Sequence, residues 1–474
     1  SDDGFQVGFW IDNAKNNRIE QNNITGFDEY GMLFQTSSHN NTIFGNTFSD
    51  NKIDIALDYS GNNEFKNNQL NSKNNNLKVT YHSYSDFVQN IDTSNKIRGK
   101  PIYYWIDKQD KAVPLDAGFV ALGNCKNITI QNLNISNNNV AIIMYSTSNS
   151  LVSENFFADN TLGISLFDCV NLSLTKNIFV EDSAGIILRA STNISISQNY
   201  LSGNYFGGYE TFGISLYSSN CSSVIANNIT DFGQFGIQLS ISTQNVIANN
   251  YLARNAIGIY IYMGGQNTIF QNSLIENKRW GMQLSSSRTQ PNNNLIYHNN
   301  FINNTSIEAG TQGNLQVSNP WYFGPETNIW DNGTVGNYWS DYLTRYTNTS
   351  EIGNTGIGDT FFVVNENNID HYPLTKPIPL SQFPNSSELE FPPSPTPNVT
   401  LIPSQPAESP AVSIESSPST ILTLSPTIPE FQTWIILPLA IITTLMVAIM
   451  VSKKKLKQSR CDIKNDFYNK QYDN

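Results

Sequence analysis

The sequence reads Asn155-Phe-Phe-Ala-Asp-Asn-Thr-Leu-Gly-Ile-Ser-Leu, and 22 residues later it reads Asn177-Ile-Phe-Val-Glu-Asp-Ser-Ala-Gly-Ile-Ile-Leu. Asn199 opens a further copy, and Gly163 and Gly185 keep the same spacing. A period of this length is typical of solenoids, in which each copy buries its apolar face only by stacking on its neighbours. The repeat therefore predicts a solenoid.

Each copy contains short alternations of apolar and polar residues, which indicate strands. Examples are Ile164-Ser-Leu166, Ile194-Ser-Ile196 and Ile237-Gln-Leu239. Asn, Gly, Ser and Asp, which are typical of turns, separate these runs. Before residue 430, no stretch has a helical period of adequate length. We therefore predict an all-β fold, a right-handed parallel β-helix with about 22 residues per coil and rungs about 4.8 Å apart.

Asn recurs at one turn position of the copies, and Gly marks another sharp corner. Asn tolerates the left-handed conformation of tight turns, and stacked Asn side chains can hydrogen-bond along the axis. We therefore expect both columns to be scaffold. The Asn column contains Asn155, Asn177, Asn199, Asn227, Asn250 and Asn272.

Breaks in the repeat and changes in composition divide the chain into segments. The segments are N-terminal coils at 1–70, an insertion between coils at 71–117, the main β-helix at 118–307, a small aromatic and Gly-rich cap module at 308–376, a disordered Pro-, Ser- and Thr-rich stalk at 377–430, one transmembrane helix at 431–452 and a cytoplasmic tail at 453–474. The spacing from Asn to Gly grows at Gly203–Tyr209, so we expect a bulge there.

The two ends of the sequence suggest an exported, anchored protein. The run Trp434–Val451 carries no charge and is about long enough for one membrane span. Lysines follow it directly, so the positive-inside rule puts the β-helix outside the cell. The chain starts without Met, in or just before a coil, so we expect upstream coils, a cap and a secretory signal before Ser1.

The composition argues against nucleic acid as a partner. Only 14% of the residues are charged, and the net charge is −12. Phosphate contacts need clustered Lys and Arg, which an acidic solenoid lacks. Few charges with abundant Asn, Ser and Thr suit an extracellular surface.

Several motifs outside the repeat resemble those of NosD-like right-handed β-helix proteins of archaea. Gly99-Lys-Pro-Ile-Tyr-Tyr-Trp105 resembles the family's insertion, and Gly336-Asn-Tyr-Trp-Ser-Asp-Tyr342 resembles the segment after its last coil. Pro429-Glu-Phe431 is similar to the PEF-type anchor signal of archaeal surface proteins. The resemblance covers nearly the whole chain. It implies either copper handling or the binding or cleavage of carbohydrate.

Copper is disfavoured by the donors available. A copper site would cluster imidazole or sulfur ligands, whereas His39, His82, His298 and His371 are spread over different coils and modules. No His-x-His, Met-x-Met or Cys-x-x-Cys pattern occurs. Cys125 and Cys169 lie two coils apart, which is too far for a disulfide.

Calcium is a candidate at one loop. Relatives of the resembled family typically carry an Asp-rich stretch before the string Gly-Ile-Gly-Asp-Thr. In this sequence Glu351, Asn354 and Asp359 could donate oxygens, but Thr355 stands where Asp is usual. Fewer charges mean weaker binding. The alternative is a Gly-rich turn.

A mostly acidic column lies four positions after the repeat Asn. Asp159 and Glu181 would lie about 5 Å apart on adjacent rungs, which is close to the separation of a retaining glycosidase pair. Two carboxylates that close would raise one pKa and give an acid and a base. Asp231 extends the column, with Arg189 or Arg254 as neighbours. The alternative is a solvated polar turn ladder.

A largely aromatic row lies four positions after the corner Gly. Aromatic rings offer flat apolar faces on which sugar rings stack. The alternative is that the row packs against the insertion at 71–117. The row contains Tyr145, Phe167, Arg189 and Tyr217, and the bulge adds Tyr205 and Tyr209.

Together these features predict a surface-anchored, NosD-like β-helix that binds a polysaccharide or envelope glycan without cleaving it. The alternative is a polysaccharide lyase, hydrolase or epimerase that uses Asp159, Glu181 or Asp231. A copper-handling protein is the third possibility.

Overall fold

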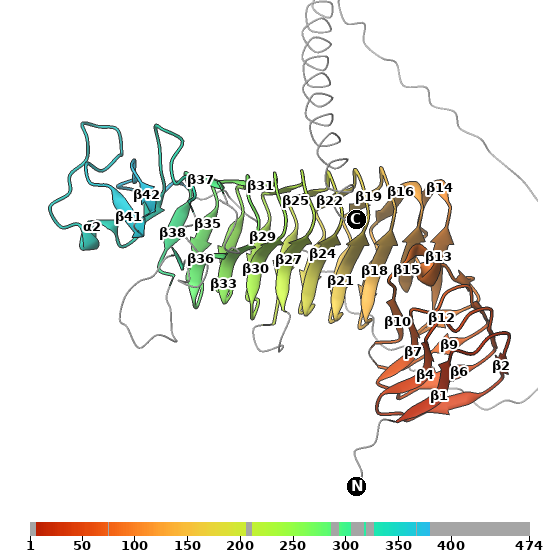
Figure 1. Ribbon diagram of the computed structural model, residues 1–474. Helices are drawn as coiled ribbons and strands as arrows, with labels where there is room; N and C mark the ends of the chain where they lie inside the picture. Colours follow the sequence, from red (N-terminus) through yellow and green to blue (C-terminus); the bar gives the residue numbers. More distant parts are fainter. Residues whose placement is uncertain are drawn as a thin grey trace, which may run out of the picture. The chain divides into compact units, whose positions relative to one another are not determined.

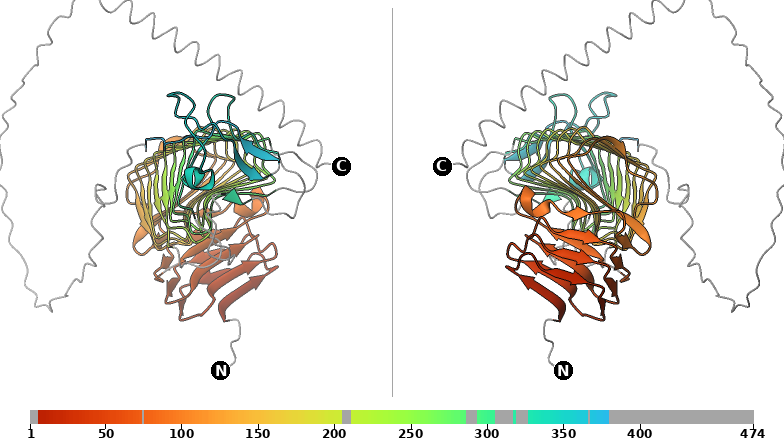
Figure 2. Two further views of the ribbon diagram at one scale, coloured as in Figure 1. Left: turned by 90° about the vertical axis from the view of Figure 1, so that its left-hand side faces the viewer. Right: turned by 90° about the vertical axis from the view of Figure 1, so that its right-hand side faces the viewer.

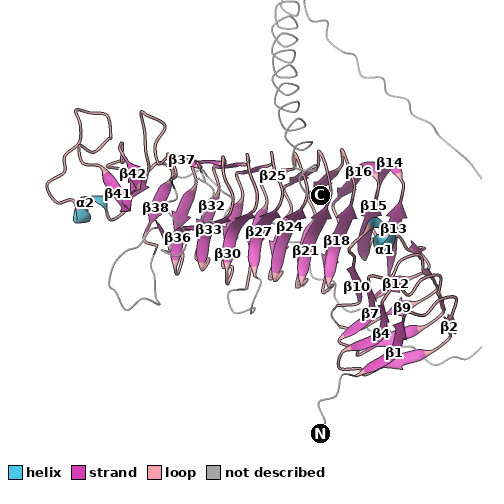
Figure 3. Cartoon of the chain, in the orientation of Figure 1, coloured by secondary structure: helices cyan, strands magenta, loops and turns pink. Residues whose placement is uncertain are grey.

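The computed structural model describes residues 6–73, 75–204, 211–285, 293–304, 317–318, 327–365 and 367–379. In these residues strands and tight turns dominate, with two short helices, α1 (Tyr84–Phe87) and α2 (Tyr342–Arg345) (Figure 3). Parallel strands wind into a right-handed β-helix of about 22 residues per turn (Figure 1). The predicted all-β parallel β-helix with about 22 residues per coil is therefore confirmed.

The N-terminal section is made of four coils, each with three strands. One sheet contains β1 (Val7–Asp12), β4 (Tyr30–Gln35), β7 (Ile53–Asp58) and β10 (Leu77–Thr80). A second contains β2 (Arg18–Glu20), β5 (Thr42–Phe44), β8 (Glu64–Lys66) and β11 (Asn90–Ile91). The third contains β3 (Asn23–Thr25), β6 (Thr47–Ser49), β9 (Gln69–Leu70) and β12 (Lys96–Ile97).

The main section has three walls, and its successive coils lie behind one another when viewed along the axis (Figure 2). The first wall contains β13 (Lys100–Ile106), β15 (Phe119–Gly123), β18 (Val140–Tyr145), β21 (Leu162–Phe167), β24 (Ala184–Arg189), β27 (Phe212–Tyr217), β30 (Phe235–Ser240), β33 (Ile257–Tyr262), β36 (Trp280–Ser285) and β39 (Val317–Ser318).

The second wall contains β14 (Gln109–Ala112), β16 (Lys126–Gln131), β19 (Leu151–Ser153), β22 (Ser173–Thr175), β25 (Ser195–Ser197), β28 (Ser223–Ile225), β31 (Val246–Ala248), β34 (Thr268–Phe270) and β37 (Leu295–Tyr297). The third wall contains β17 (Asn134–Ser136), β20 (Phe156–Ala158), β23 (Ile178–Val180), β26 (Tyr200–Ser202), β29 (Asn228–Thr230), β32 (Tyr251–Ala253), β35 (Ser273–Ile275), β38 (Asn300–Ile302) and β40 (Tyr338–Trp339).

The alternation of apolar and polar residues along each strand determines which side chains form the core. Ile164 and Leu166 of β21 are fully buried inside the coil, whereas Phe167 lies on the outer face and is half-buried. Gly163 is needed at its corner because a Cβ there would run into the Phe179 ring and the Gly185 carbonyl. The glycine column therefore serves close packing between coils.

Buried Asn side chains join successive coils at the turns. Asn199 donates from its backbone N and its Nδ2 to Oδ1 of Asn227, both at 2.9 Å. Asn227 donates in the same way to Asn250 at 2.9 and 3.0 Å, and its Nδ2 also reaches the Ile196 carbonyl at 3.0 Å. This ladder runs through Asn155, Asn177, Asn199, Asn227, Asn250, Asn272, Asn299 and Asn337.

The expectation that the ladder Asn residues adopt the left-handed conformation is wrong. That conformation falls on the residue before each of them, as at Glu154 (φ 57°) and Lys176 (φ 56°), which precede Asn155 and Asn177. The reason is that the Asn side chain must point into the turn to reach the next coil. Asn is therefore required at this position for its amide rather than for its backbone tolerance.

The expectation of an insertion between coils at 71–117 is also wrong. Residues 77–97 supply β10, β11 and β12, which complete the fourth N-terminal coil, and β13 and β14 begin the main section. In this coil Gln89 and Asn95 take the ladder positions that Asn63 and Asn68 hold one coil earlier, but they follow after 26 and 27 residues, because α1 lengthens the coil. The 22-residue spacing of the preceding coil is therefore lost, although the strands persist. The chain reverses between β12 and β13, which pair antiparallel across Arg98 and Gly99.

Arg98 ties the two sections together at this reversal. Its guanidinium donates to Asn76 Oδ1 (2.5 Å) of the N-terminal section and to Asn137 O (3.1 Å) and Asn138 Oδ1 (3.1 Å) of the main section, and also to Ser136 O. A planar fork with five donors suits such a multiple contact.

The Gly336–Tyr342 motif closes the end of the core. Trp339 stacks on Phe301 (4.4 Å between ring centroids) and on Phe362 (4.2 Å) of β41 (Phe362–Asn365). Its Nε1 donates to Asp370 Oδ2 (2.9 Å) at the end of β42 (Asn368–Asp370), and Asn337 N donates to the same oxygen (2.7 Å). The Asn ladder thus ends at the buried Asp370 carboxyl group, which also accepts a hydrogen bond from Trp339.

The stalk from residue 380 onward, the expected transmembrane helix at 431–452 and the tail at 453–474 lie outside the described residues. No helix within the described ranges is long and apolar enough to span a membrane.

A second ladder of buried side chains contains Asn138, Asn160 and Asp182. In this ladder Asp182 stands at a position where the preceding coils have Asn. Its Oδ1 accepts from Asn160 N (2.6 Å) and Nδ2 (2.9 Å), but its buried Oδ2 has no partner. Asn160 Nδ2 also donates to the Ile135 carbonyl (3.2 Å). Phe157 pairs with Ile135 on the next coil, so its carbonyl is for Asp182 what the Ile135 carbonyl is for Asn160. Burial raises the pKa of Asp182 to about 8. A protonated acid can donate to that carbonyl, whereas a carboxylate cannot.

Replacing Asn227 with Ala should lower the free energy of unfolding by about 2–4 kcal/mol, because buried donors and acceptors on both neighbouring coils lose their partner. Chemical denaturation measures the change. Asn23→Ala, at an exposed position of β3, is the control and should cost less than about 0.5 kcal/mol. Equal effects of the two variants would show that the ladder does not stabilise the coils.

Asp182→Asn should stabilise the protein in a pH-dependent way. Because the folded pKa of about 8 lies above the unfolded value, the cost of ionising Asp182 is absent at acid pH and grows as pH rises to about 8. Asn cannot ionise, so its advantage should be small near pH 4 and a few kcal/mol, on the order of 2–5, above pH 8. Melting temperatures of both proteins across this range test it, and parallel curves would contradict it.

Candidate functional site

The outer face of the first wall presents three columns of side chains. Strands pair in register from coil to coil, so each column runs along the axis. The first column is Val140, Leu162, Ala184, Phe212, Phe235, Ile257 and Trp280; the second is Ile143, Ser165, Ile187, Ser215, Gln238, Tyr260 and Gln283; the third is Tyr145, Phe167, Arg189, Tyr217, Ser240, Tyr262 and Ser285.

The N-terminal section covers the beginning of this face. The Tyr81 ring contacts the rings of Tyr145 (5.1 Å between centroids) and Phe167 (5.6 Å), and Tyr84 and Phe87 also pack on Tyr145. Tyr145 is consequently only 8% exposed. Tyr145 and Phe167 therefore pack against residues of 71–117, which was the alternative to ligand binding by the aromatic row.

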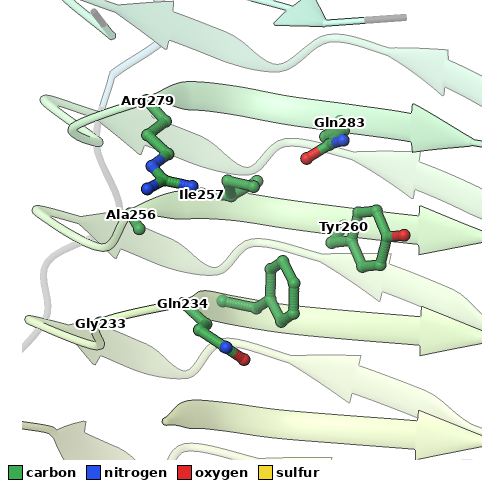
Figure 4. Close-up of a pocket in the computed structure, with 8 residues that line it drawn as sticks. Gly233, Gln234, Ala256, Ile257, Tyr260, Arg279 and Gln283 are labelled. Carbon is green, nitrogen blue, oxygen red and sulfur yellow. The ribbon is translucent and has the colours of Figure 1, made fainter. Parts of the chain in front are cut away.

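Among the described residues, the face from β24 onward is hollowed. Two adjoining hollows of about 540 and 440 Å³ share Gln234, Phe235 and Tyr260, so they form one groove along the axis. Figure 4 shows side chains of successive coils lying together on this face. The groove is lined by Ile187, Arg189, Phe212, Ser215, Tyr217, Gly233, Gln234, Phe235, Gln238, Ala256, Ile257, Tyr260, Arg279 and Gln283.

Aromatic rings form much of the groove. Phe235 and Tyr260 stack on adjacent coils, with centroids 4.6 Å apart and planes inclined by 11°. Tyr217 is 49% exposed at the edge. Partial burial of Tyr260 raises the pKa of its phenol, so the hydroxyl is neutral and can both donate and accept a hydrogen bond.

The groove ends abruptly at Arg189. In the third column Arg189 pairs in register with the covered Phe167 on one side and with Tyr217 on the other. Tyr81 lies over Phe167 and hydrogen-bonds Ser165, and burial raises the pKa of its phenol to about 12. The exposed Arg189 guanidinium thus lies beside a fixed aromatic wall.

The carboxylates expected to be catalytic lie at turns outside the lining of the groove. Asp159, Glu181 and Asp231 all have left-handed backbones (φ 56°, 57° and 65°) at the turn after a third-wall strand. Asp231 accepts from Nε (2.9 Å) and NH2 (2.7 Å) of Arg254 on the next coil. This bidentate pair occupies both of its oxygens.

The expected calcium loop is held by its own hydrogen bonds. Asp359 accepts from the hydroxyls of Thr349 (2.8 Å) and Ser350 (2.7 Å), which with further bonds hold the pKa of its carboxyl far below its usual range. Glu351 accepts from the Gly356 backbone N at 2.8 Å, and Asn354 is exposed nearby. A calcium ion at this loop stays a prediction.

Tyr205 and Tyr209 lie outside the described residues. Of the remaining residues expected to bind a ligand, Arg189 and Tyr217 line the groove. The sequence reading missed Phe235, Tyr260 and Gln238 because it followed only the third column. The signal was present at the position directly before the corner Gly, where Phe212 and Phe235 stand.

A family model described as "Periplasmic copper-binding protein (NosD)" matches residues 3–83, 90–256 and 208–344. The chain belongs to the NosD family. No curated protein matches it.

The donors of this NosD-family chain do not fit a copper centre in the part that the structure describes. Met32, Met144 and Met282 are fully buried in the cores. Cys125 and Cys169 are buried and unpaired, as expected, and burial raises the pKa of Cys169 to about 12. Within the described ranges, no three His, Cys, Asp or Glu gather in one place.

Solved structures match the chain at low identity and with TM-scores below 0.5. A periplasmic alginate epimerase, AlgG, is 17% identical with a TM-score of 0.35, over 54% of this chain and 66% of that one. The A-module of the Azotobacter vinelandii mannuronan C-5 epimerase AlgE4 is 12% identical with a TM-score of 0.29, over 66% and 91%. PfbA, a surface adhesin of Streptococcus pneumoniae, is 12% identical with a TM-score of 0.22, over 60% and 83%. The chain spans less than two thirds of AlgG.

Proposed function

We propose that this NosD-family protein is a cell-envelope module that binds a polysaccharide along the first-wall groove without cleaving it. The observation that carries the proposal is the set of aromatic, amide and arginine side chains that five successive coils bring to one open face. Aromatic faces stack on the apolar faces of sugar rings, and amides and guanidinium groups hydrogen-bond their hydroxyls.

The form of the groove supports a chain-like ligand. Arg189 on β24 and Gln283 on β36 are separated by four rung steps, or about 19 Å at about 4.8 Å per rung. The Phe235–Tyr260 stack lies between them. An open strip of this length suits several linked sugars better than one small molecule.

The state of the turn carboxylates supports binding over cleavage. Asp231 is neutralised by Arg254, and Asp159 and Glu181 project from turns outside the groove lining. The family description is of periplasmic proteins, which supports a place in the envelope. Anchoring by 431–452 belongs to the same proposal and rests on the sequence.

Tyr260→Ala and Phe235→Ala should each weaken polysaccharide binding roughly tenfold, because each removes half of the ring stack. Calorimetry on the purified full chain with a panel of neutral and uronic polysaccharides measures this. Tyr297→Ala is the matched control, since Tyr297 stacks on Phe270 (5.5 Å) on the second wall. Equal losses in all three variants would contradict binding at the groove.

Incubation with the same polysaccharides should release no new reducing or unsaturated ends, with or without calcium. End-group assays and product chromatography check this directly. New ends that disappear in Asp159→Asn or Glu181→Gln would replace the binding module with an enzyme. Asp58→Asn, at a carboxylate of the N-terminal section, is the control for that comparison.

A further inference from the structure

The positive charge in the groove and its closed end at Arg189 indicate which kind of polysaccharide the groove would bind. Arg189 lines the groove at β24, and Arg279 lines it at the start of β36. Figure 4 shows Arg279 on the same face as Ile257 and Tyr260. The two guanidinium groups therefore bracket the aromatic floor along the axis.

Guanidinium groups select oxyanions. Arg binds carboxylate or sulfate with two parallel hydrogen bonds, and such charge-assisted bonds are about twice as strong as neutral ones. An arginine whose only task is to bind sugar hydroxyls gains little from its charge. An exposed arginine at the end of a ring stack, as Arg189 is, therefore favours a glycan that carries an anionic group.

The wall beside Arg189 limits how such a glycan can lie. Phe167, one rung before Arg189, is covered by Tyr81, and Ser165 of the same strand is only 7% exposed beneath the Tyr81 hydroxyl. Tyr81 is itself packed on Phe87 and Tyr145 (5.4 and 5.1 Å). A glycan lying along the axis therefore cannot continue past β24.

We propose that the groove binds the end of an anionic polysaccharide chain, and that Arg189 holds the carboxylate or sulfate of the terminal sugar against the Tyr81 wall. This inference rests on the proposed function. It adds the charge of the ligand and the part of the chain that is recognised.

The charge is tested by calorimetry on the full chain with three oligosaccharides of equal length: an oligouronate, a sulfated oligomer and a neutral oligomer. At least one anionic oligomer should bind about tenfold more tightly than the neutral one, and added salt should reduce the difference. Whichever anionic oligomer binds more tightly identifies the group.

Arg189→Gln should abolish the preference for the anionic oligomer while retaining weak binding. Arg254→Gln, which removes an exposed arginine away from the groove, is the matched control and should keep the preference. Unchanged melting temperatures verify that both variants fold. Equal binding of neutral and anionic oligomers, or equal effects of the two variants, would overturn the inference and leave the proposed function standing. No binding of any oligomer would overturn both.

End recognition is tested separately by stoichiometry on anionic chains of increasing length. One protein per chain at every length is the expected result. A ratio that grows with chain length would show that internal segments bind and would overturn the closed end.

Discussion

The hydrogen bond that an Asn side chain makes to the next Asn along the axis supports everything else in this molecule. Each buried amide accepts two hydrogen bonds from the coil before it and donates to the coil after it. Apolar packing cannot satisfy the backbone N–H and C=O groups of these buried turns. The ladder satisfies the turn amides inside the protein, where an unpaired group would cost about 1–3 kcal/mol. It thereby fixes the register on which the outer columns depend.

The ladder also explains why the ends of the solenoid need special residues. A stack of amides must stop, and its last members would otherwise face solvent or apolar core. At one end the Asp370 carboxyl accepts from the backbone N of Asn337, the last Asn of the ladder, and from Nε1 of Trp339. Where the two sections meet, the guanidinium of Arg98 supplies donors to carbonyl and amide oxygens of both. In both places a residue that is not part of the repeat, Asp370 or Arg98, makes the hydrogen bonds where the repeat is interrupted.

The sequence allowed the fold class, the Asn column and part of the groove to be predicted, because strand alternation and a fixed period are local signals. Arg189 and Tyr217 were found by counting from the corner Gly, and both line the groove. Tyr145 could not be separated from them by counting, since its burial depends on Tyr81, which is distant in sequence. The fourth coil was hidden because α1 lengthens it, so its ladder residues Gln89 and Asn95 follow Asn63 and Asn68 after 26 and 27 residues instead of 22. Likewise, the Asp231–Arg254 pair is set by register between coils, which the spacing suggested but could not establish.

The reversal between β12 and β13 has an evolutionary consequence. Within the main section the strands of each wall pair in parallel from coil to coil, and the Asn ladder runs in one direction along the axis. Duplication or loss of one repeat between β24 and β36 would lengthen or shorten the groove by one rung and leave its closed end beside Arg189 intact. A duplication that crossed Arg98 and Gly99 would instead add a second reversal and a second break in the core. Gain or loss of repeats can therefore change the length of the groove, whereas the closed end beside Tyr81 stays the same.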